Sequence, residues 1–134
     1  SYTLLEPISL IERRDAREGI KSILDSVAQN LGSTPSRAQR TFSATGTVSD
    51  VLRIALYSFL HNSQSFADTV TGAVMFGGDT DSYGALAGAY SGALHGREGI
   101  PPHLYKNIEN KEVLEQRARE LYQSRAERRI AHTI

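Results

Sequence analysis

Gly84, Gly88 and Gly92 stand four residues apart in a segment of small residues, and Gly96 continues the row. On an α-helix this spacing places the glycines on one face. Each interior glycine costs a helix about 1 kcal/mol relative to alanine, so three of them cost roughly 3 kcal/mol. Such a row persists where the close approach of another helix offsets the loss. We therefore expect this segment to be a helix in tight contact with a second helix.

Apolar residues recur at helical spacing along most of the chain. One stripe ends before Gly32 and contains Ile20, Ile23, Leu24, Val27, Ala28 and Leu31. Residues 32–47 are rich in Ser, Thr, Gly and Arg and are predicted to form a loop. The patterns Thr47-x-x-Asp50 and Ser65-x-x-Asp68 have the form of capping boxes, so each predicts the start of a helix.

The second half of the chain predicts two further helices. Gly77-Gly78 ends the short helix after Ser65, and the glycine-bearing helix is expected over roughly residues 82–95. Asn110 is the expected N-cap of a last helix. The apolar stripe of that helix would contain Leu114, Ala118, Leu121, Tyr122 and Ala126. Residues 2–12 fit either an extended segment or the entry to the first helix. The predicted fold class is all-α.

Charge and composition exclude several classes of protein. Lys plus Arg and Asp plus Glu each number 15, so the formal net charge is zero. This balance is not typical of a non-specific nucleic-acid binder or of a polybasic membrane-surface protein. The absence of Cys excludes disulfides and thiolate metal sites. The longest apolar stretch is too short to span a bilayer. We expect a soluble, cytoplasmic protein that binds neither nucleic acid nor membrane.

Two acids follow the glycine pair directly. Asp79 and Asp81 are two residues apart in the sequence Gly-Gly-Asp-Thr-Asp-Ser. At an effective dielectric near 20, two carboxylates about 4 Å apart repel by about 4 kcal/mol. No Lys or Arg occurs from Ile54 to Gly96 to offset this repulsion. Mg²⁺ or Mn²⁺ would offset it, and the Ser82 hydroxyl is a further oxygen ligand. The alternative is that one acid simply caps the following helix, and the residues alone favour neither interpretation.

Four stretches form a recognisable set: Thr-Gly-Thr-Val-Ser-Asp at 45–50, Ala-Leu-Tyr-Ser-Phe-Leu at 55–60, the turn at 76–82 with its helix, and Ile100-Pro101. Together they resemble the ADP-ribosylglycohydrolase family, which includes dinitrogenase reductase-activating glycohydrolases, ADP-ribosyl-arginine and ADP-ribosyl-serine hydrolases, and a jellyfish lens crystallin. The likeness is strongest over residues 42–123. It implies that residues 1–134 are the C-terminal portion of one domain with an orthogonal, multi-helical fold.

The resemblance also implies a function. Members of this family are metal-dependent hydrolases that cleave the glycosidic bond between ADP-ribose and an acceptor, on a protein side chain or a small molecule. Two Mg²⁺ or Mn²⁺ ions occupy the complete site. The metal ligands implied in this chain are Asp79, Asp81 and Ser82. The implied substrate-binding residues are Gly46, Thr47 and Val48. Ser82 stands where Thr is usual, and Thr47 stands where an aromatic residue is frequent.

One departure from the family pattern is large. Family members are longer, and their N-terminal half brings a Thr-Asp-Asp metal motif and a catalytic carboxylate that have no counterpart here. The chain would thus supply half of the dinuclear site, with the other half on the same or another polypeptide, and alone it is expected to be inactive. Two alternatives stay open: a non-catalytic pseudoenzyme or crystallin-like structural relative, and a helical interaction module.

Overall fold

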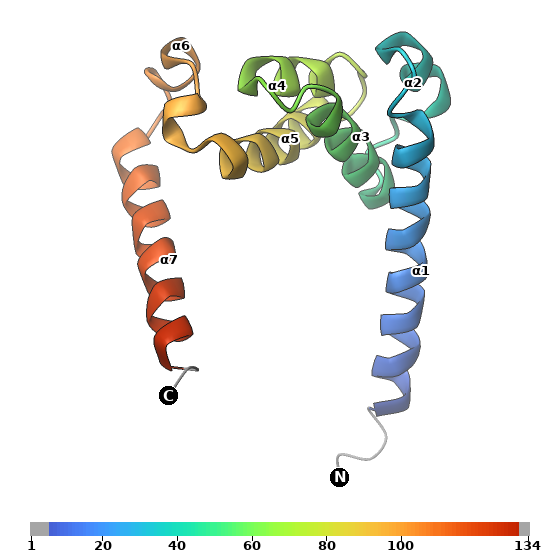
Figure 1. The fold of residues 1–134 in the computed structure, drawn as a ribbon, viewed down its shortest axis with the longest axis horizontal. Coiled ribbons are helices and arrows are strands. Elements are labelled where there is room, and N and C mark those ends of the chain that lie inside the picture. Colours follow the sequence, from blue (N-terminus) through green and yellow to red (C-terminus); the bar gives the residue numbers. More distant parts are fainter. Residues whose placement is uncertain (1–5, 132–134) are drawn as a thin grey trace. The chain divides into compact units, whose positions relative to one another are not determined.

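The computed structural model describes the backbone of residues 6–131 and the side chains of residues 15–124. Every regular element in the described part is helical, which confirms the all-α prediction. In chain order these elements are α1 (Glu6–Asn30), α2 (Pro35–Thr41), α3 (Val48–His61), α4 (Phe66–Val74), α5 (Thr80–His95), the 3₁₀ helix η1 (Arg97–Gly99), α6 (Pro102–Tyr105) and α7 (Lys111–Ala131) (Figure 1). They fall into two compact units, residues 1–99 and 100–134.

Both predicted capping patterns start helices. The Thr47 hydroxyl accepts a hydrogen bond from the backbone N–H of Asp50 at 3.3 Å, at the start of α3. The Ser65 hydroxyl accepts the same bond from Asp68 at 3.2 Å, at the start of α4. A cap of this kind typically stabilises a helix by about 1 kcal/mol.

The prediction of a loop over residues 32–47 is wrong in part, because α2 lies inside it. Thr34 is the N-cap of α2 and Pro35 takes the first helical position, where its missing N–H is not needed. Ala38 and Phe42 are both buried in the core. Burial of these two side chains offsets the polar composition that favoured a loop.

Fewer residues of the predicted apolar stripe of α1 are buried than the sequence pattern suggests. Ile23 and Val27 are buried, and α1 packs on α3. Ile20 and Leu24, on the same predicted stripe, keep about half of their surface exposed in the described structure. Residues 6–12, whose conformation the sequence left open, begin α1, whereas residues 2–5 lie outside the described part.

The core of the first unit lies among α3, α4 and α5, which all pack on one another. Tyr83, Ala87 and Ser91 recur every four residues along α5 and are fully buried. The rings of Phe42, Tyr57 and Phe76 are in mutual contact, with centroids 5.5–6.0 Å apart. This cluster connects the C-terminal end of α2, helix α3 and the segment between α4 and Asp79.

The glycine row lies against α4, as a helix–helix contact requires. A Cβ at Gly84 would lie 3.2 Å from Val74, and one at Gly88 would lie 3.4 Å from Val70 and 3.6 Å from Phe66. Phe66, Val70 and Val74 are themselves four residues apart on α4. The contact confirms the predicted packing of α5 on a second helix. Side chains of α4, rather than its backbone, occupy the space beside the glycines.

The second unit contains α6 and α7. Asn110 directly precedes α7 and has a φ of 56°, and its carbonyl accepts a hydrogen bond from the N–H of Leu114. The predicted apolar stripe is not buried in this unit: Leu114, Leu121 and Tyr122 are exposed, and the side chain of Ala126 lies outside the described residues. Among the described helices, none combines the length and apolar composition that crossing a membrane requires.

We predict that two substitutions in the glycine row differ in sign or size. Gly92→Ala should raise the free energy of unfolding by up to about 1 kcal/mol, because its nearest neighbour would be 3.9 Å away and alanine favours the helix. Gly84→Ala should gain less or lose stability, because Val74 must move. Urea unfolding of both variants measures this difference. An equal or larger gain at Gly84 would contradict the packing described for α4 and α5.

Candidate functional site

The acidic turn is shaped by two glycines with positive φ, 74° at Gly77 and 69° at Gly78. Asp79 follows with φ −79° and ψ 61°, and the N–H of Thr80 donates to the carbonyl of Gly78 at 2.9 Å. These values describe an inverse γ-turn centred on Asp79. The turn projects Asp79 immediately before the first residue of α5.

Helix α5 begins at Thr80, two residues earlier than expected, so Asp81 and Ser82 lie in its first turn. Asp79 occupies the N-cap position, but its side chain makes no capping hydrogen bond. Asp81 lies inside the first turn, where the nearby backbone N–H groups of Ser82 and Asp81 help to lower its pKa. Asp79 therefore holds the capping position without forming the capping bond.

The neighbouring Asp79 carboxyl group is the main cause that lowers the pKa of Asp81, followed by the backbone N–H groups of Ser82 and Asp81. Two carboxylates that lie near each other repel unless a positive charge offsets the repulsion. In the described part of the chain no Lys, Arg or His forms an ion pair with either acid. The pair therefore lacks a basic partner among the described side chains.

A second loop lies against the turn. Gly46 has a φ of 77°, and its N–H donates to the hydroxyl of the fully buried Tyr83 at 3.2 Å. A Cβ at Gly46 would lie 3.1 Å from both Cβ and Oδ2 of Asp79, and one at Gly78 would lie 2.2 Å from the carbonyl oxygen of Ala44. The two loops thus meet nearly backbone to backbone, and glycine is required at Gly46 and Gly78 for this approach.

Asp50 anchors this second loop from within. Its Oδ2 accepts from the N–H of Thr45 at 3.3 Å and from the Thr45 hydroxyl, and its Oδ1 pairs with Arg53 at 3.0 Å. Burial raises the pKa of Asp50, but the hydrogen bonds from Thr45 and Thr47 and the charge of Arg53 outweigh it, so the pKa is lowered. Asp50 is only 5% exposed and stays ionised, which makes it a charged anchor for the loop.

An open cavity of about 390 Å³ lies between the two loops and the first turns of α3 and α5. It is lined by Gly46, Val48, Val51, Leu52, Asp79, Ser82 and Leu86. The wall is thus mostly aliphatic, with one carboxylate and one hydroxyl as its polar side chains. A wall of this kind suits a ligand with an apolar face and a polar or charged end.

The structure brings together four of the six residues singled out from the sequence, because Gly46, Val48, Asp79 and Ser82 line the same cavity. The other two are placed differently. Thr47 uses its hydroxyl to cap α3, and Asp81 is exposed beside Asp79 without lining the cavity. Among the described side chains, no group of three or more His, Cys, Asp or Glu residues is arranged to hold a metal ion.

Sequence reasoning missed two residues that build this site. The capping pattern predicts a role for Asp50 only at the start of a helix, and no sequence pattern predicts a role for Tyr83. The signal for Asp50 is a carboxylate and an arginine three residues apart next to an apolar run. Tyr83 gives a weaker signal, namely a large ring in a helix that otherwise consists mostly of small residues.

Comparison with known proteins gives one family. Residues 3–131 match the sequence profile of the ADP-ribosylglycohydrolases. The ADP-ribosylarginine hydrolase Tri1 of Pseudomonas putida (strain GB-1) is 31% identical over 93 residues, which are 69% of this chain and 25% of that protein. The ADP-ribosylhydrolase ARH1 of Dictyostelium discoideum is 35% identical over 68 residues, 51% of this chain and 17% of that protein. The matched part is thus a quarter or less of either relative. No solved structure matches the chain significantly.

The close approach of the loops predicts unequal effects at the two glycines of the turn. Gly77→Ala should lower the free energy of unfolding by about 1–2 kcal/mol, because φ is positive but no atom lies within 4 Å of the added Cβ. Gly78→Ala should lower it by about 3 kcal/mol or more, because the Cβ also overlaps the Ala44 carbonyl. Urea midpoints of both variants test this, and equal losses would contradict the loop contact.

The anchor at Asp50 predicts a pH dependence. Its pKa is lower in the folded chain than the ordinary 3.8, so its stabilisation is complete above that pH and is lost as pH falls through the folded pKa. Asp50→Asn should lower the free energy of unfolding at pH 7 by about 1–3 kcal/mol and flatten its decline below pH 3.8. Urea unfolding from pH 7 to pH 2 measures both effects. Asp25→Asn, at an exposed position of α1, is the control and should change stability at pH 7 by less than about 0.5 kcal/mol.

Proposed function

The chain belongs to the ADP-ribosylglycohydrolase family, and on this basis we propose that it supplies part of a metal-dependent site that hydrolyses the bond between ADP-ribose and an acceptor. Both relatives are ADP-ribosyl hydrolases by name. The observation that supports the proposal most is the shared cavity, where Asp79 and Ser82 face Gly46 and Val48. Residues from two segments that are distant in the chain meet there beside Asp79, which forms no ion pair within the described structure.

The proposed metal ligands are Asp79, Asp81 and Ser82, and their chemistry fits the group. Carboxylate and hydroxyl oxygens are the hard ligands that Mg²⁺ and Mn²⁺ prefer. The two acids stand at the start of α5, Asp79 at the N-cap and Asp81 in the first turn, so a cation bound by both would offset their repulsion. No described basic side chain competes for it. A bound divalent cation would stabilise negative charge at oxygen atoms of the reacting sugar.

The remaining lining residues would bind and orient the substrate. The face of Gly46 that lacks a Cβ lies against the Asp79 side chain, so backbone borders that carboxylate on this side. Val48 is 76% exposed at the cavity and offers an apolar surface, continued by Val51, Leu52 and Leu86. We propose that this aliphatic wall packs on an apolar face of the ligand and keeps water from that side.

The proposed site is incomplete within this chain. Two carboxylates and one hydroxyl are too few for two octahedral ions, even with bound water. The chain spans a quarter or less of the relatives it matches. We therefore propose that it supplies half of a dinuclear site and that the other ligands come from the rest of the family domain, on the same or another polypeptide. Alone, the chain should bind a cation without turning over substrate.

A second candidate is a non-catalytic relative that keeps the fold as a scaffold. Such a relative needs no metal ligands, and the described side chains hold no group of three or more His, Cys, Asp or Glu residues arranged for a metal ion. Cation binding separates the two candidates. A scaffold that has lost the site should have the same Mn²⁺ affinity alone and together with a polypeptide that carries the rest of the family domain.

Cation binding tests the main proposal. Asp79→Asn and Asp81→Asn should each weaken Mn²⁺ binding at least about tenfold. Loss of a residue that only hydrogen-bonds to a metal ligand already has an effect of this size. Ser82→Thr should preserve binding, because it keeps the oxygen ligand. Asp68→Asn, in the first turn of α4, is the control and should leave affinity unchanged. Calorimetric titration with MnCl₂ gives the affinities.

Turnover is tested in the same variants. Release of ADP-ribose from an ADP-ribosylated arginine peptide is measured with the chain alone and together with a polypeptide carrying the rest of the family domain. Activity should require both parts and should be lost in Asp79→Asn. Full activity of that variant in the combined sample would refute the ligand role of Asp79.

A further inference from the structure

We infer that Asp50 is a positioning residue for the Asp79 carboxylate, acting through the loop of residues 44–47. The inference depends on the proposed function only for the identity of the cation that Asp79 binds. The mechanical coupling between the two acids depends on contacts of the described residues alone, so the two ideas can be tested separately.

The first step of the coupling joins Asp50 to Thr45. Both carboxylate oxygens of Asp50 are engaged, Oδ2 by the N–H and hydroxyl of Thr45 and Oδ1 by Arg53 at 3.0 Å. Asp50 is buried and does not line the cavity. It therefore acts on the loop and is not itself placed to touch a ligand in the cavity.

The second step joins the loop to Asp79. Thr45 is bonded to Gly46, whose N–H donates to the buried Tyr83 hydroxyl at 3.2 Å. The open face of Gly46 lies so close to Asp79 that an added Cβ would be 3.1 Å from its carboxylate. Two fixed points, Asp50 and Tyr83, thus hold Gly46 in place. A shift of Thr45 would move Gly46 along the Asp79 side chain.

The third step is the effect on Asp79 itself. Its side chain makes no capping bond and no ion pair within the described structure. Its neighbours are the Gly46 backbone and the Asp81 carboxyl. Gly46 thus limits the conformations of the carboxylate, and releasing the loop would leave more of them to be lost when a ligand binds. Residues that orient ligands in this way change metal affinity by about 10–100-fold.

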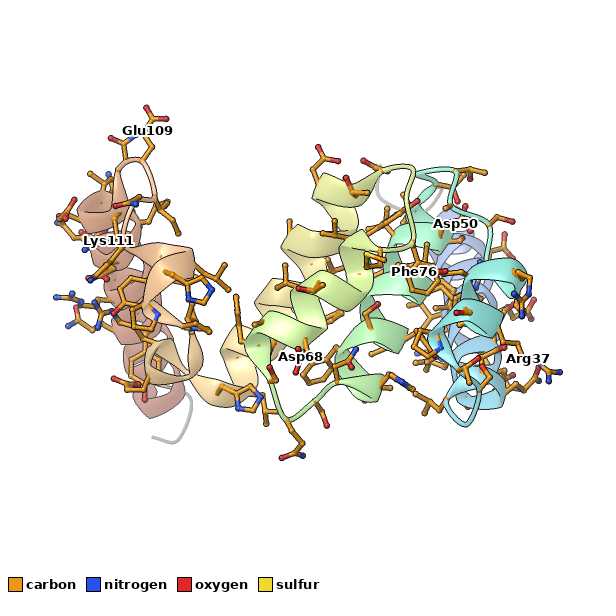
Figure 2. All side chains as sticks on the ribbon, turned by 90° about the horizontal axis from the view of Figure 1, so that it is seen from above. Arg37, Asp50, Asp68, Phe76, Glu109 and Lys111 are labelled. Carbon is orange, nitrogen blue, oxygen red and sulfur yellow. The ribbon has the colours of Figure 1, made fainter. Side chains whose placement is uncertain are left out.

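The chain offers a matched control for helix capping. Asp50 is the third residue of α3 after the N-cap Thr47, and Asp68 is the third residue of α4 after the N-cap Ser65. Figure 2 shows the two acids well apart, and Asp68 is exposed. Substitution of either removes an acid from the first turn of a helix, but only Asp50 holds the Gly46 loop.

The test compares Asp50→Ala, Asp50→Asn and Asp68→Ala in the full chain. The rate of amide hydrogen exchange at Gly46 measures how firmly the loop of residues 44–47 is held. Titration with MnCl₂ measures the cation affinity of the site that contains Asp79. Asp50→Ala should speed exchange at Gly46 at least about tenfold and weaken Mn²⁺ binding about 10–100-fold. Asp50→Asn keeps an acceptor for Thr45 and should restore part of both losses. Asp68→Ala should change neither, although it also removes a first-turn acid.

A further variant keeps the test decisive if Asp50→Ala does not fold. Thr45→Val removes the hydroxyl that donates a hydrogen bond to Asp50. It keeps the Asp50 carboxylate and its ion pair with Arg53. It should speed exchange at Gly46 and weaken Mn²⁺ binding in the same direction. Unchanged exchange at Gly46 in every folded variant at Asp50 or Thr45 would overturn the inference.

The two readouts separate this inference from the proposed function. If the wild-type chain binds no Mn²⁺, alone or with the rest of the domain, the proposed cation site fails. Exchange at Gly46, together with the NMR shifts of the Asp79 side chain, then still decides the coupling. If Mn²⁺ binds but is weakened equally by Asp50→Ala and Asp68→Ala, the coupling is overturned and the cation site stands.

Discussion

The contact between two glycine-bearing loops is the constraint on which the candidate site depends. At Gly78 the chain passes so close to the Ala44 carbonyl that a Cβ would be 2.2 Å from its oxygen, and a Cβ at Gly46 would be 3.1 Å from the Asp79 side chain. This approach places an acid next to backbone from a distant segment. A side chain at Gly78 would force the two loops apart.

The packed helices α3, α4 and α5 hold the two loops in contact. Tyr83 lies in the buried row of α5 and reaches Gly46 with its hydroxyl, so α5 supplies both the acidic turn and one support of the opposite loop. The glycine row on the same helix fits the side chains of α4. Packing of α5 therefore fixes the place of Asp79, and the polar chemistry of the site rests on apolar and glycine contacts. The acid pair has no basic partner among the described side chains.

Several features follow from the sequence alone because they are local. The caps at Thr47 and Ser65 depend on side chains that reach backbone groups three residues away. The glycine row falls on one face because helical spacing requires it. The adjacency of Asp79 and Asp81, and the resemblance to the family, are likewise written in consecutive residues. The sequence by itself therefore determined the starts of α3 and α4, the packing face of α5, the acid pair and the family.

Other features were decided only by the tertiary structure, because they depend on neighbours that are distant in the chain. Burial of Ala38 turned an expected loop into α2, and contact with α3 selected which residues of the α1 stripe are buried. Likewise, only the fold gave Asp50 its role as an anchor and separated Asp79, which lines the cavity, from Asp81, which does not. The local sequence shows which side chains and backbone groups can form contacts. The packing of segments that are distant in the chain decides which of these groups come together.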